Sequence, residues 1–296
     1  MSWLHLLGPV NQFGKHYRLV LADTPELMGE VFRIRHEVYC EELGFEAVNA
    51  EGRERDEHDE HSRHLLLRCL RTGAWAGCIR LVLAPGDRPA LRLPSERVCA
   101  TTIDARLYDP ASHRREGVAE ISRLAVAREF RYRGRDRQEP GAVAQGECRA
   151  PTHPRSPYIP LGLYLGVIAL AHRLGIRTLL FLTEPRLAAH LRRLGFPFRQ
   201  ISAPVQHRGT RVLSMGNVGG DCLGRLPFYM RPLYRVVDGE VEDGLEHGSA
   251  ARGFHRFARR HPLLHASQPH AGAAYSRGET PRWEGLASRP PSMRAG

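Results

Sequence analysis

The 296-residue chain is nearly devoid of lysine. Of its 43 basic residues only Lys15 is lysine, and the rest are arginine. The chain also lacks a continuous apolar run of about eighteen residues, which excludes a transmembrane helix. Met1 to Gly14 shows neither early basic residues nor a small-residue cleavage site, so we expect no signal peptide. We therefore predict a cytoplasmic protein with no membrane span.

Paired cysteines are also missing. The six cysteines form no C-x-x-C pair and have no regular spacing, so we predict reduced, mostly packed thiols. Cys78 lies within an apolar segment, where a buried packing residue is more common than a nucleophile. The other cysteines are Cys40, Cys69, Cys99, Cys148 and Cys222.

Negative charge is in deficit, and the formal net charge is +11. Nucleic acid is the usual partner of so basic a chain, and the arginine-rich stretches 128–157 and 250–260 suggest it. No helix-turn-helix, zinc finger or interleaving of aromatic and basic residues accompanies this charge, so we predict no nucleic-acid binding. An acidic carrier protein or a phosphate-bearing cofactor fits the charge equally well.

Hydrophobic periodicity predicts both helices and strands. The clearest patterns are a helix from Thr24 to Gly44 and a hairpin of residues 63–70 and 75–84. We also expect helices at 160–174 and 185–194, strands at 16–22, 118–127, 178–182, 198–201 and 226–237, and a loop at 51–61. An early hairpin followed by alternating strands and helices predicts an α/β fold with a mixed sheet.

Composition predicts how the chain is divided. Residues 1–238 form one domain, and residues 129–157 within it are dense in Arg, Gly and Pro, as in a long mobile insertion. Residues 239–296 lack periodicity and are expected to be a disordered tail.

Two groups of polar residues in the first part of the chain could carry chemistry. Arg35 and Tyr39 lie one turn apart on one helix face, followed by Phe45; the alternative is a surface arginine stacked on an aromatic ring. The acidic segment that begins at Asp56 and includes Asp59 also contains histidines, which suggests a metal site. No matching distal ligands accompany it, so we predict no metal and favour carboxylates that face a cationic amine.

A third group interrupts an apolar strand. Glu120, Ser122 and Arg123 stand in the sequence EISR, where an ionised group is costly unless it is paired or functional. In a regular strand Glu120 and Ser122 share one face and Arg123 points to the other. A structural ion pair with Arg80, which interrupts a second apolar strand, is the alternative to a catalytic role.

Together these residues resemble the acyl-homoserine-lactone synthase branch of the GNAT superfamily. The resemblance is closer to N-acyl amino acid synthases and to acyltransferases associated with the PEP-CTERM/exosortase system. It covers roughly residues 16 to 237 and includes the segments RIRHEVYCEELGFE, DEHD and EISRLAV. The residues that match the family pattern, in order, are Arg35, Tyr39, Phe45, Asp56, Asp59, Arg80, Glu120 and Arg123.

The resemblance implies a GNAT fold, a mixed twisted sheet flanked by helices and splayed where a thioester enters. It implies a cytoplasmic enzyme that uses acyl-carrier-protein or acyl-CoA thioesters as cosubstrates and holds no permanent cofactor. Lactone synthases carry Trp where this chain has Phe45, which argues against lactone synthesis. The Gly-rich pyrophosphate loop is poorly kept at Arg131 to Asp136, which favours an acyl carrier protein as partner over coenzyme A.

The predicted reaction is transfer of a fatty acyl group from a thioester to a small amine such as an amino acid. Glu120 and Ser122 are the predicted catalytic residues, with Glu120 as the base. Backbone N–H groups from Leu124 to Val126 polarise the carbonyl, and the acyl chain lies against the helix at 163–174. Asp56 and Asp59 orient the acceptor or its loop, whereas Arg80 and Arg123 fix strand ends and carboxylates. The alternatives are an inactive acyl-thioester sensor and a nucleic-acid-binding protein.

Overall fold

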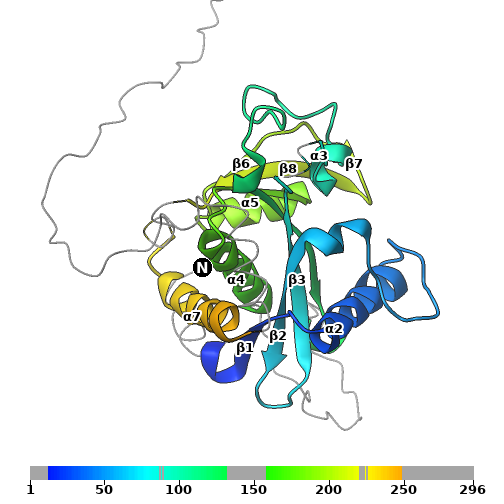
Figure 1. Ribbon diagram of the computed structural model, residues 1–296, viewed down its shortest axis with the longest axis vertical. Helices are drawn as coiled ribbons and strands as arrows, with labels where there is room; N and C mark the ends of the chain where they lie inside the picture. Colours follow the sequence, from blue (N-terminus) through cyan, green and yellow to red (C-terminus); the bar gives the residue numbers. More distant parts are fainter. Residues whose placement is uncertain are drawn as a thin grey trace, which may run out of the picture.

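A single mixed sheet organises the molecule (Figure 1). This computed structural model describes residues 13–86, 88, 90–131, 158–219, 224 and 226–248. The strands follow the order β1-β2-β3-β4-β5-β8-β6, and β7 pairs with β8. Their bounds are β1 Tyr17–Leu21, β2 Ser62–Cys69, β3 Trp75–Leu83, β4 Val118–Val126, β5 Thr178–Thr183, β6 Phe198–Gln200, β7 Val205–Gln206 and β8 Thr210–Asn217.

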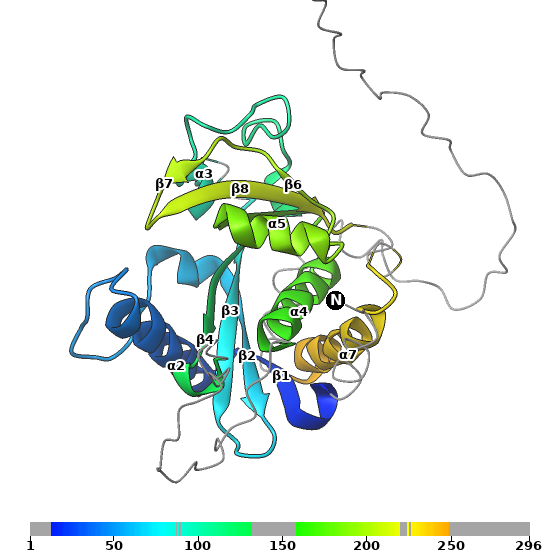
Figure 2. The same cartoon turned by 180° about the vertical axis from the view of Figure 1, so that it is seen from behind.

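Helices cover both faces of the sheet. The α-helices are α2 Pro25–Arg35, α3 Pro94–Val98, α4 Tyr158–Arg173, α5 Pro185–Arg193 and α7 Arg231–His247, and a π-helix His36–Glu42 extends α2. Helices α4 and α7 lie side by side on one face, and α2 lies on the other (Figures 1 and 2). Helix α4 is apolar on nearly every side because the sheet and α7 enclose it.

The sheet opens between β4 and β5. These two strands run parallel, but their pairing extends only from Val118 to Ile121 on β4, opposite Thr178 to Phe181 on β5. Beyond Ile121, β4 continues to Val126 with a partner on the β3 side alone. The second half of β4 therefore has free peptide groups where the sheet splays.

A β-bulge lies in this free half. Cys78 pairs with Ala125 and Arg80 pairs with Ser122, so two steps along β3 match three steps along β4. The extra residue lies at Arg123, whose φ of 50° is left-handed. Gly77 permits the approach of β4 here, because a Cβ at Gly77 would lie 2.5 Å from the Ala125 carbonyl oxygen.

Most predicted elements are confirmed. Thr24 caps α2, accepting a hydrogen bond from Leu27 N at 3.3 Å, and Gly44, with φ of 61°, ends the turn after the π-helix. The hairpin, the helices at 160–174 and 185–194, and the strands at 118–127, 178–182 and 198–201 also agree. Within the segment predicted as a loop, Glu57–His61 forms a 3-10 helix capped by Asp56.

The strand predicted at 226–237 is wrong. Residues from Arg231 onward form α7, because Leu233, Val237 and Val241 recur at a spacing of four and bury one helical stripe against α4 and β1. The expected boundary after residue 238 falls inside α7, which continues to His247. The tail after Gly248 and most of the 129–157 insertion lie outside the described residues.

The β7–β8 hairpin was not predicted. Its segment Thr210–Asn217 mixes polar and apolar residues without clear alternation, yet it pairs with both β5 and β6. Sheet pairing therefore determined this strand more than its own periodicity did.

The cysteines whose environment is described are buried free thiols: Cys40, Cys69, Cys78 and Cys99. Burial raises the pKa of the Cys78 thiol to about 12, which favours the packing role over the nucleophile. Cys148 and Cys222 lie outside the described residues. Among the described helices, none has the length and apolarity that crossing a bilayer requires.

Candidate functional site

Arg35 forms the inner part of a buried ionic cluster. The end of α2 places its side chain, fully shielded from solvent, between two carboxylates. Its Nε donates to Glu54 Oε2 at 2.5 Å, and its Nη1 donates to Asp59 Oδ1 at 2.6 Å. The guanidinium lies over the Phe32 ring at 5.5 Å rather than over Tyr39. The alternative of a surface arginine is therefore wrong.

Arg80 joins the same cluster from β3. Its Nη1 donates to Asp56 Oδ1 at 2.6 Å and to Asp59 Oδ1 at 2.8 Å. Its Nε donates to Ser122 Oγ at 3.0 Å, which links the cluster to β4. Arg80 thus binds two carboxylates and one hydroxyl, and the positioning role stays a prediction.

Arg123 lies on this same side, contrary to the prediction for a regular strand. The bulge turns its side chain toward the cluster, where Nη2 donates to Glu46, Glu54 and Asp56 at 3.0, 3.0 and 3.1 Å. The guanidinium lies 5.4 Å from the centre of the Tyr39 ring. Because one extra residue is inserted in β4, the side chains of Ser122 and Arg123 face the same side of the sheet instead of opposite sides.

A fourth arginine completes the cluster from the β7–β8 turn. Arg208 Nη2 lies 2.6 Å from Glu46 Oε1, and its guanidinium lies 6.0 Å from the centre of the Phe45 ring. Four arginines thus face four carboxylates. The arginines are Arg35, Arg80, Arg123 and Arg208, and the carboxylates are Glu46, Glu54, Asp56 and Asp59.

The arginines hold the carboxylates ionised. Although burial opposes ionisation, hydrogen bonds and charge from Arg35 lower the pKa of Glu54 and Asp59, and those from Arg80 lower that of Asp56. His64 lies beside Asp59, with Nε2 3.5 Å from Oδ1, but burial together with Arg35 lowers its pKa to about 3. His64 is therefore a neutral member of a charge-balanced cluster.

Glu120 occupies a separate, drier position. It is 3% exposed, and its Oε2 accepts hydrogen bonds from Ser95 N at 2.8 Å and Ser95 Oγ at 2.7 Å. Burial raises its pKa to about 7, against the opposing effect of the Ser95 hydrogen bonds. The alternative of a direct Glu120–Arg80 ion pair is not supported, because Arg80 binds Asp56, Asp59 and Ser122 instead.

The backbone of β4 beyond Ile121 lines the opening in the sheet. The Tyr39 hydroxyl donates to the Leu124 carbonyl oxygen at 2.7 Å, which holds the strand just past the bulge. Val126 pairs with Gly77 on the β3 side. The predicted polarising peptides, Leu124 to Val126, therefore lie where β5 no longer pairs with β4.

Four functional positions were not identified from the sequence: Glu46, Glu54, Ser95 and Arg208. Glu54 and Glu46 stand in acidic stretches that gave no reason to select one residue over its neighbours. Ser95 follows Pro94 at the start of a five-residue helix, and Arg208 precedes Gly209 in a turn. Of these four positions only Arg208 offered a local clue, because the glycine that follows it is a typical turn residue.

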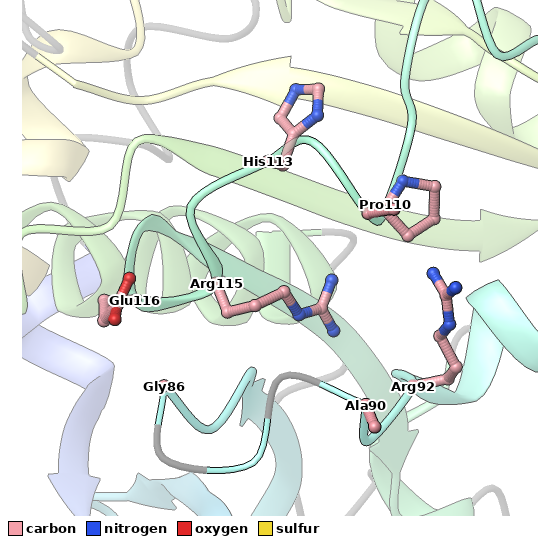
Figure 3. Close-up of a pocket in the computed structure, with 8 residues that line it drawn as sticks. Gly86, Ala90, Arg92, Pro110, His113, Arg115 and Glu116 are labelled. Carbon is pink, nitrogen blue, oxygen red and sulfur yellow. The ribbon is translucent and has the colours of Figure 1, made fainter.

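Within the described residues, no group of three or more His, Cys, Asp or Glu side chains is arranged to hold a metal ion. Asp56 and Asp59 bind arginines instead. A polar cavity of about 450 Å³ lies elsewhere, between the loops on either side of α3 (Figure 3). It is lined by Gly86, Ala90, Arg92, Pro110, Ala111, His113, Arg115 and Glu116, none of which is a predicted site residue.

Comparison with known proteins supports this description of the fold. Residues 34–137 match the acetyltransferase (GNAT) domain family, a span that includes Arg35, the acidic segment, Arg80 and all of β4. No curated protein sequence matches the chain.

Several solved structures are similar to this chain. TofI in a ternary complex with an inhibitor and MTA is 20% identical, covers 71% of this chain and 95% of its own, and has a TM-score of 0.50. FeeM, an N-acyl amino acid synthase from uncultured soil microbes, is 16% identical over 72% of this chain and 96% of its own, with a TM-score of 0.47. MesI, a CoA-dependent acyl-homoserine lactone synthase, is 20% identical over 75% and 94%, with a TM-score of 0.46.

The domain match and the architecture confirm the predicted GNAT fold. They also agree with the predicted class of enzyme, an acyltransferase.

Proposed function

We propose that the protein transfers a fatty acyl group from a carrier thioester to the nitrogen of a small amine, such as an amino acid. The observation that carries this proposal is the free half of β4, where unpaired peptide groups lie two residues beyond a buried carboxylate. The GNAT domain match gives the reaction class. The identity of the acyl chain, of the amine and of the carrier goes beyond this match and is part of the proposal.

Glu120 acts as the base in this reaction. It removes a proton from the acceptor ammonium, directly or through a water, and the resulting amine attacks the thioester carbonyl carbon. A C–N bond forms and the C–S bond breaks. Two protons leave the nitrogen in all: one protonates the leaving thiolate, and the other passes through Glu120 to solvent. A pKa near 7 suits this exchange, because the carboxylate form and the acid form are both accessible near neutrality.

The backbone of β4 polarises the carbonyl. The N–H groups of Leu124 and Val126 face the β5 side, because that of Ala127 donates to Ala76 on the β3 side and N–H groups alternate along a strand. They become available where pairing with β5 ends and can donate to the oxyanion of the tetrahedral intermediate. The Tyr39 hydroxyl fixes the Leu124 peptide from the carbonyl side. Ser122 is held by Arg80 between Glu120 and these peptides, where its hydroxyl can relay a proton.

The ionic cluster supports the site rather than reacting. Asp59 is nearly buried between Arg35 and Arg80, so it holds the arginines in place. Asp56 is the more exposed of the two aspartates, and its carboxylate can also receive the acceptor ammonium. Asp56 therefore orients the amine, and Asp59 keeps the two arginines in position.

An acyl carrier protein is the proposed donor. The polar side of α5 exposes Arg186, Arg192 and Arg193, a cationic face suited to an acidic protein. The sequence following Arg131 lacks a full glycine cradle for a diphosphate. The link to exosortase-associated enzymes stays a prediction from sequence resemblance.

The test is product analysis by mass spectrometry. The full chain, supplied with C8 to C16 acyl thioesters and a mixture of amino acids and amines, is expected to form N-acyl products. Glu120→Gln should lower the rate by about 10²–10⁴-fold, whereas Arg235→Gln on the outer side of α7 should not change it. Bound acyl carrier without amide product from any amine would instead support the thioester sensor.

A further inference from the structure

Glu46 lies between two strained arginines. Among the described residues, the non-glycine positions with left-handed φ are Arg123 at 50° and Arg208 at 51°. Both guanidiniums reach the same oxygen, Glu46 Oε1, at 3.0 and 2.6 Å. Left-handed backbone is strained at a non-glycine residue, and such strain concentrates at functional sites.

Arg208 is the arginine of the cluster that a ligand can reach. Its side chain is 29% exposed, against 17% for Arg123 and almost none for Arg35 and Arg80. Among the described contacts its carboxylate partner is bound through Nη2, and no contact uses Nε or Nη1. Arginine binds a carboxylate best through two parallel donors, so Arg208 retains capacity for a second, bidentate partner.

Arginine charges predominate around His207, which precedes Arg208, although Arg211 also pairs with Glu184 at 2.8 Å. Burial and the charges of Arg208, Arg211 and Arg123 lower the pKa of His207, and Glu46 only partly opposes them. Arg211 also donates to the Arg208 carbonyl oxygen at 2.9 Å, which fixes the turn. An amino acid whose amine has lost its proton carries a net negative charge, so this rim matches the reactive form of such an acceptor.

Phe45 supplies a neighbouring apolar surface. It follows the turn after the π-helix, where Phe45 N and Glu46 N both donate to the Tyr39 carbonyl oxygen. The Arg208 guanidinium lies against this half-buried ring. The ring orients the planar guanidinium while its edge donors stay free.

We propose that Arg208 recognises a carboxylate on the acceptor amine, which replaces Glu46 on its guanidinium. This inference rests on the proposed acyl transfer and narrows the acceptor to amines that carry a carboxylate, such as α-amino acids. Glu46 is then an internal competitor that occupies Arg208 until the acceptor binds. In this arrangement the β7–β8 turn selects the acceptor, whereas β4 carries the base and the peptide groups that polarise the carbonyl.

The experiment compares each acid with its amide. Phenylalanine and phenylalaninamide, and glycine and glycinamide, are offered with the same acyl thioester, and kcat/KM is expressed per neutral amine. The wild-type chain should prefer the acids by about 10- to 100-fold, the range of a charge-assisted hydrogen bond. Arg208→Gln should abolish this preference, and Arg208→Lys should restore part of it.

Glu46→Gln should change acid binding in the opposite direction to Arg208→Gln. Removing the competitor should lower KM for the acid several-fold and leave the acid preference intact or larger. If the Arg208–Glu46 pair only braced the hairpin, both variants would weaken acid and amide alike, and the inference would be overturned. Arg235→Gln serves as the matched arginine control and should keep the wild-type preference.

Binding without turnover separates the two proposals. Calorimetric titration of the full chain with phenylalanine and with phenylalaninamide needs no thioester. If no acceptor is acylated but phenylalanine binds selectively and Arg208→Gln abolishes that binding, the acyl-transfer proposal fails and the carboxylate site stands. If acids and amides are acylated equally by the wild type, acyl transfer stands and the carboxylate site is refuted.

Discussion

The Glu120 side chain combines two conditions that normally conflict. It is buried among apolar neighbours of β4 and α3, which favours the neutral acid, yet Ser95 offers it two hydrogen bonds that favour the carboxylate. The outcome is a carboxyl group that titrates near neutrality. A fully paired carboxylate such as Asp59 would be too weak a base for this task.

We expect the rate to follow the ionisation of Glu120. Below pH 6 the carboxyl is protonated and cannot accept a proton, so kcat/KM should rise with pH and level off above the pKa of about 7. The measurement is a pH–rate profile with the acceptor concentration expressed as neutral amine. A profile in Glu120→Gln that kept the same midpoint would assign the titration to another group.

The same raised pKa has a consequence for stability. Folded Glu120 binds its proton more tightly than in the unfolded chain, where the pKa is near 4.5. The stability that this proton confers is therefore fully present below about pH 4.5, is lost as pH rises through the folded pKa of about 7, and does not change further above it. The Glu120→Gln variant avoids this loss. When both proteins are melted over a range of pH values, the melting temperature of Glu120→Gln should therefore exceed that of the wild type at pH 8 and approach it at pH 5.

At the scale of elements, α5 presents a charged face away from the chemistry. Leu191 and Ala188 pack inward, while the arginines at its two ends face solvent. This division is visible in the sequence, because the apolar positions recur at helical spacing. Helix α5 is therefore the surface that we propose for the carrier partner, with no part in catalysis.

Charge reversal on α5 should distinguish the two possible donors. Arg192→Glu with Arg193→Glu is expected to raise KM for acyl carrier thioesters at least tenfold and to raise it less for acyl-CoA. The comparison is steady-state kinetics at low and moderate salt, since screening reduces the steering between charged proteins. Equal losses with both donors would contradict carrier docking at this helix.

Sequence periodicity predicted where helices and strands occur better than it predicted their local geometry and pairing. The helix at Pro25–Arg35 and the apolar strand Thr178–Thr183 have strong local patterns and were found. The bulge at Arg123 was not found, because EISRLAV is compatible with a regular strand and the extra residue is defined only by pairing with β3. Strand β8 was missed for a similar reason, since its neighbours β5 and β6 determine it.

At the scale of the whole molecule, the site is assembled from distant segments. Arg35, Asp59, Arg80 and Arg123 come from four elements, and Arg208 comes from a fifth. The family-like motifs identified all but the last. Only the fold shows that the arginines and carboxylates neutralise one another, because motifs carry residue types but no distances.

The cluster should also be a main source of stability. Arg35→Gln leaves Glu54 and Asp59 partly uncompensated in a buried site, and we expect a loss of about 3–5 kcal/mol in the free energy of unfolding. Arg33→Gln is the control, because Arg33 pairs with Glu30 at an exposed position, where a change within about 0.5 kcal/mol is typical. Urea unfolding at pH 7 measures both variants.

Acid should reduce the effect of this substitution. The lowered pKa values of Glu54 and Asp59 stabilise the wild type fully above their unfolded values near 4, and the contribution is lost as pH falls below them. The gap between wild type and Arg35→Gln should therefore shrink toward pH 3. A gap that stayed constant with pH would mean that packing of Arg35, not its charge, is responsible.

The short parallel contact between β4 and β5 also makes the sheet two leaves joined by a narrow hinge. Strands β1 to β4 form one leaf, strands β5 to β8 form the other, and four residue pairs from Val118 to Ile121 are the sheet contact between them. Thermal motion that widens the opening would bend this hinge and leave each leaf intact. Amide hydrogens of the hinge should accordingly exchange with solvent sooner than those in the interior of β3, and a long acyl chain wedged between the leaves would slow them.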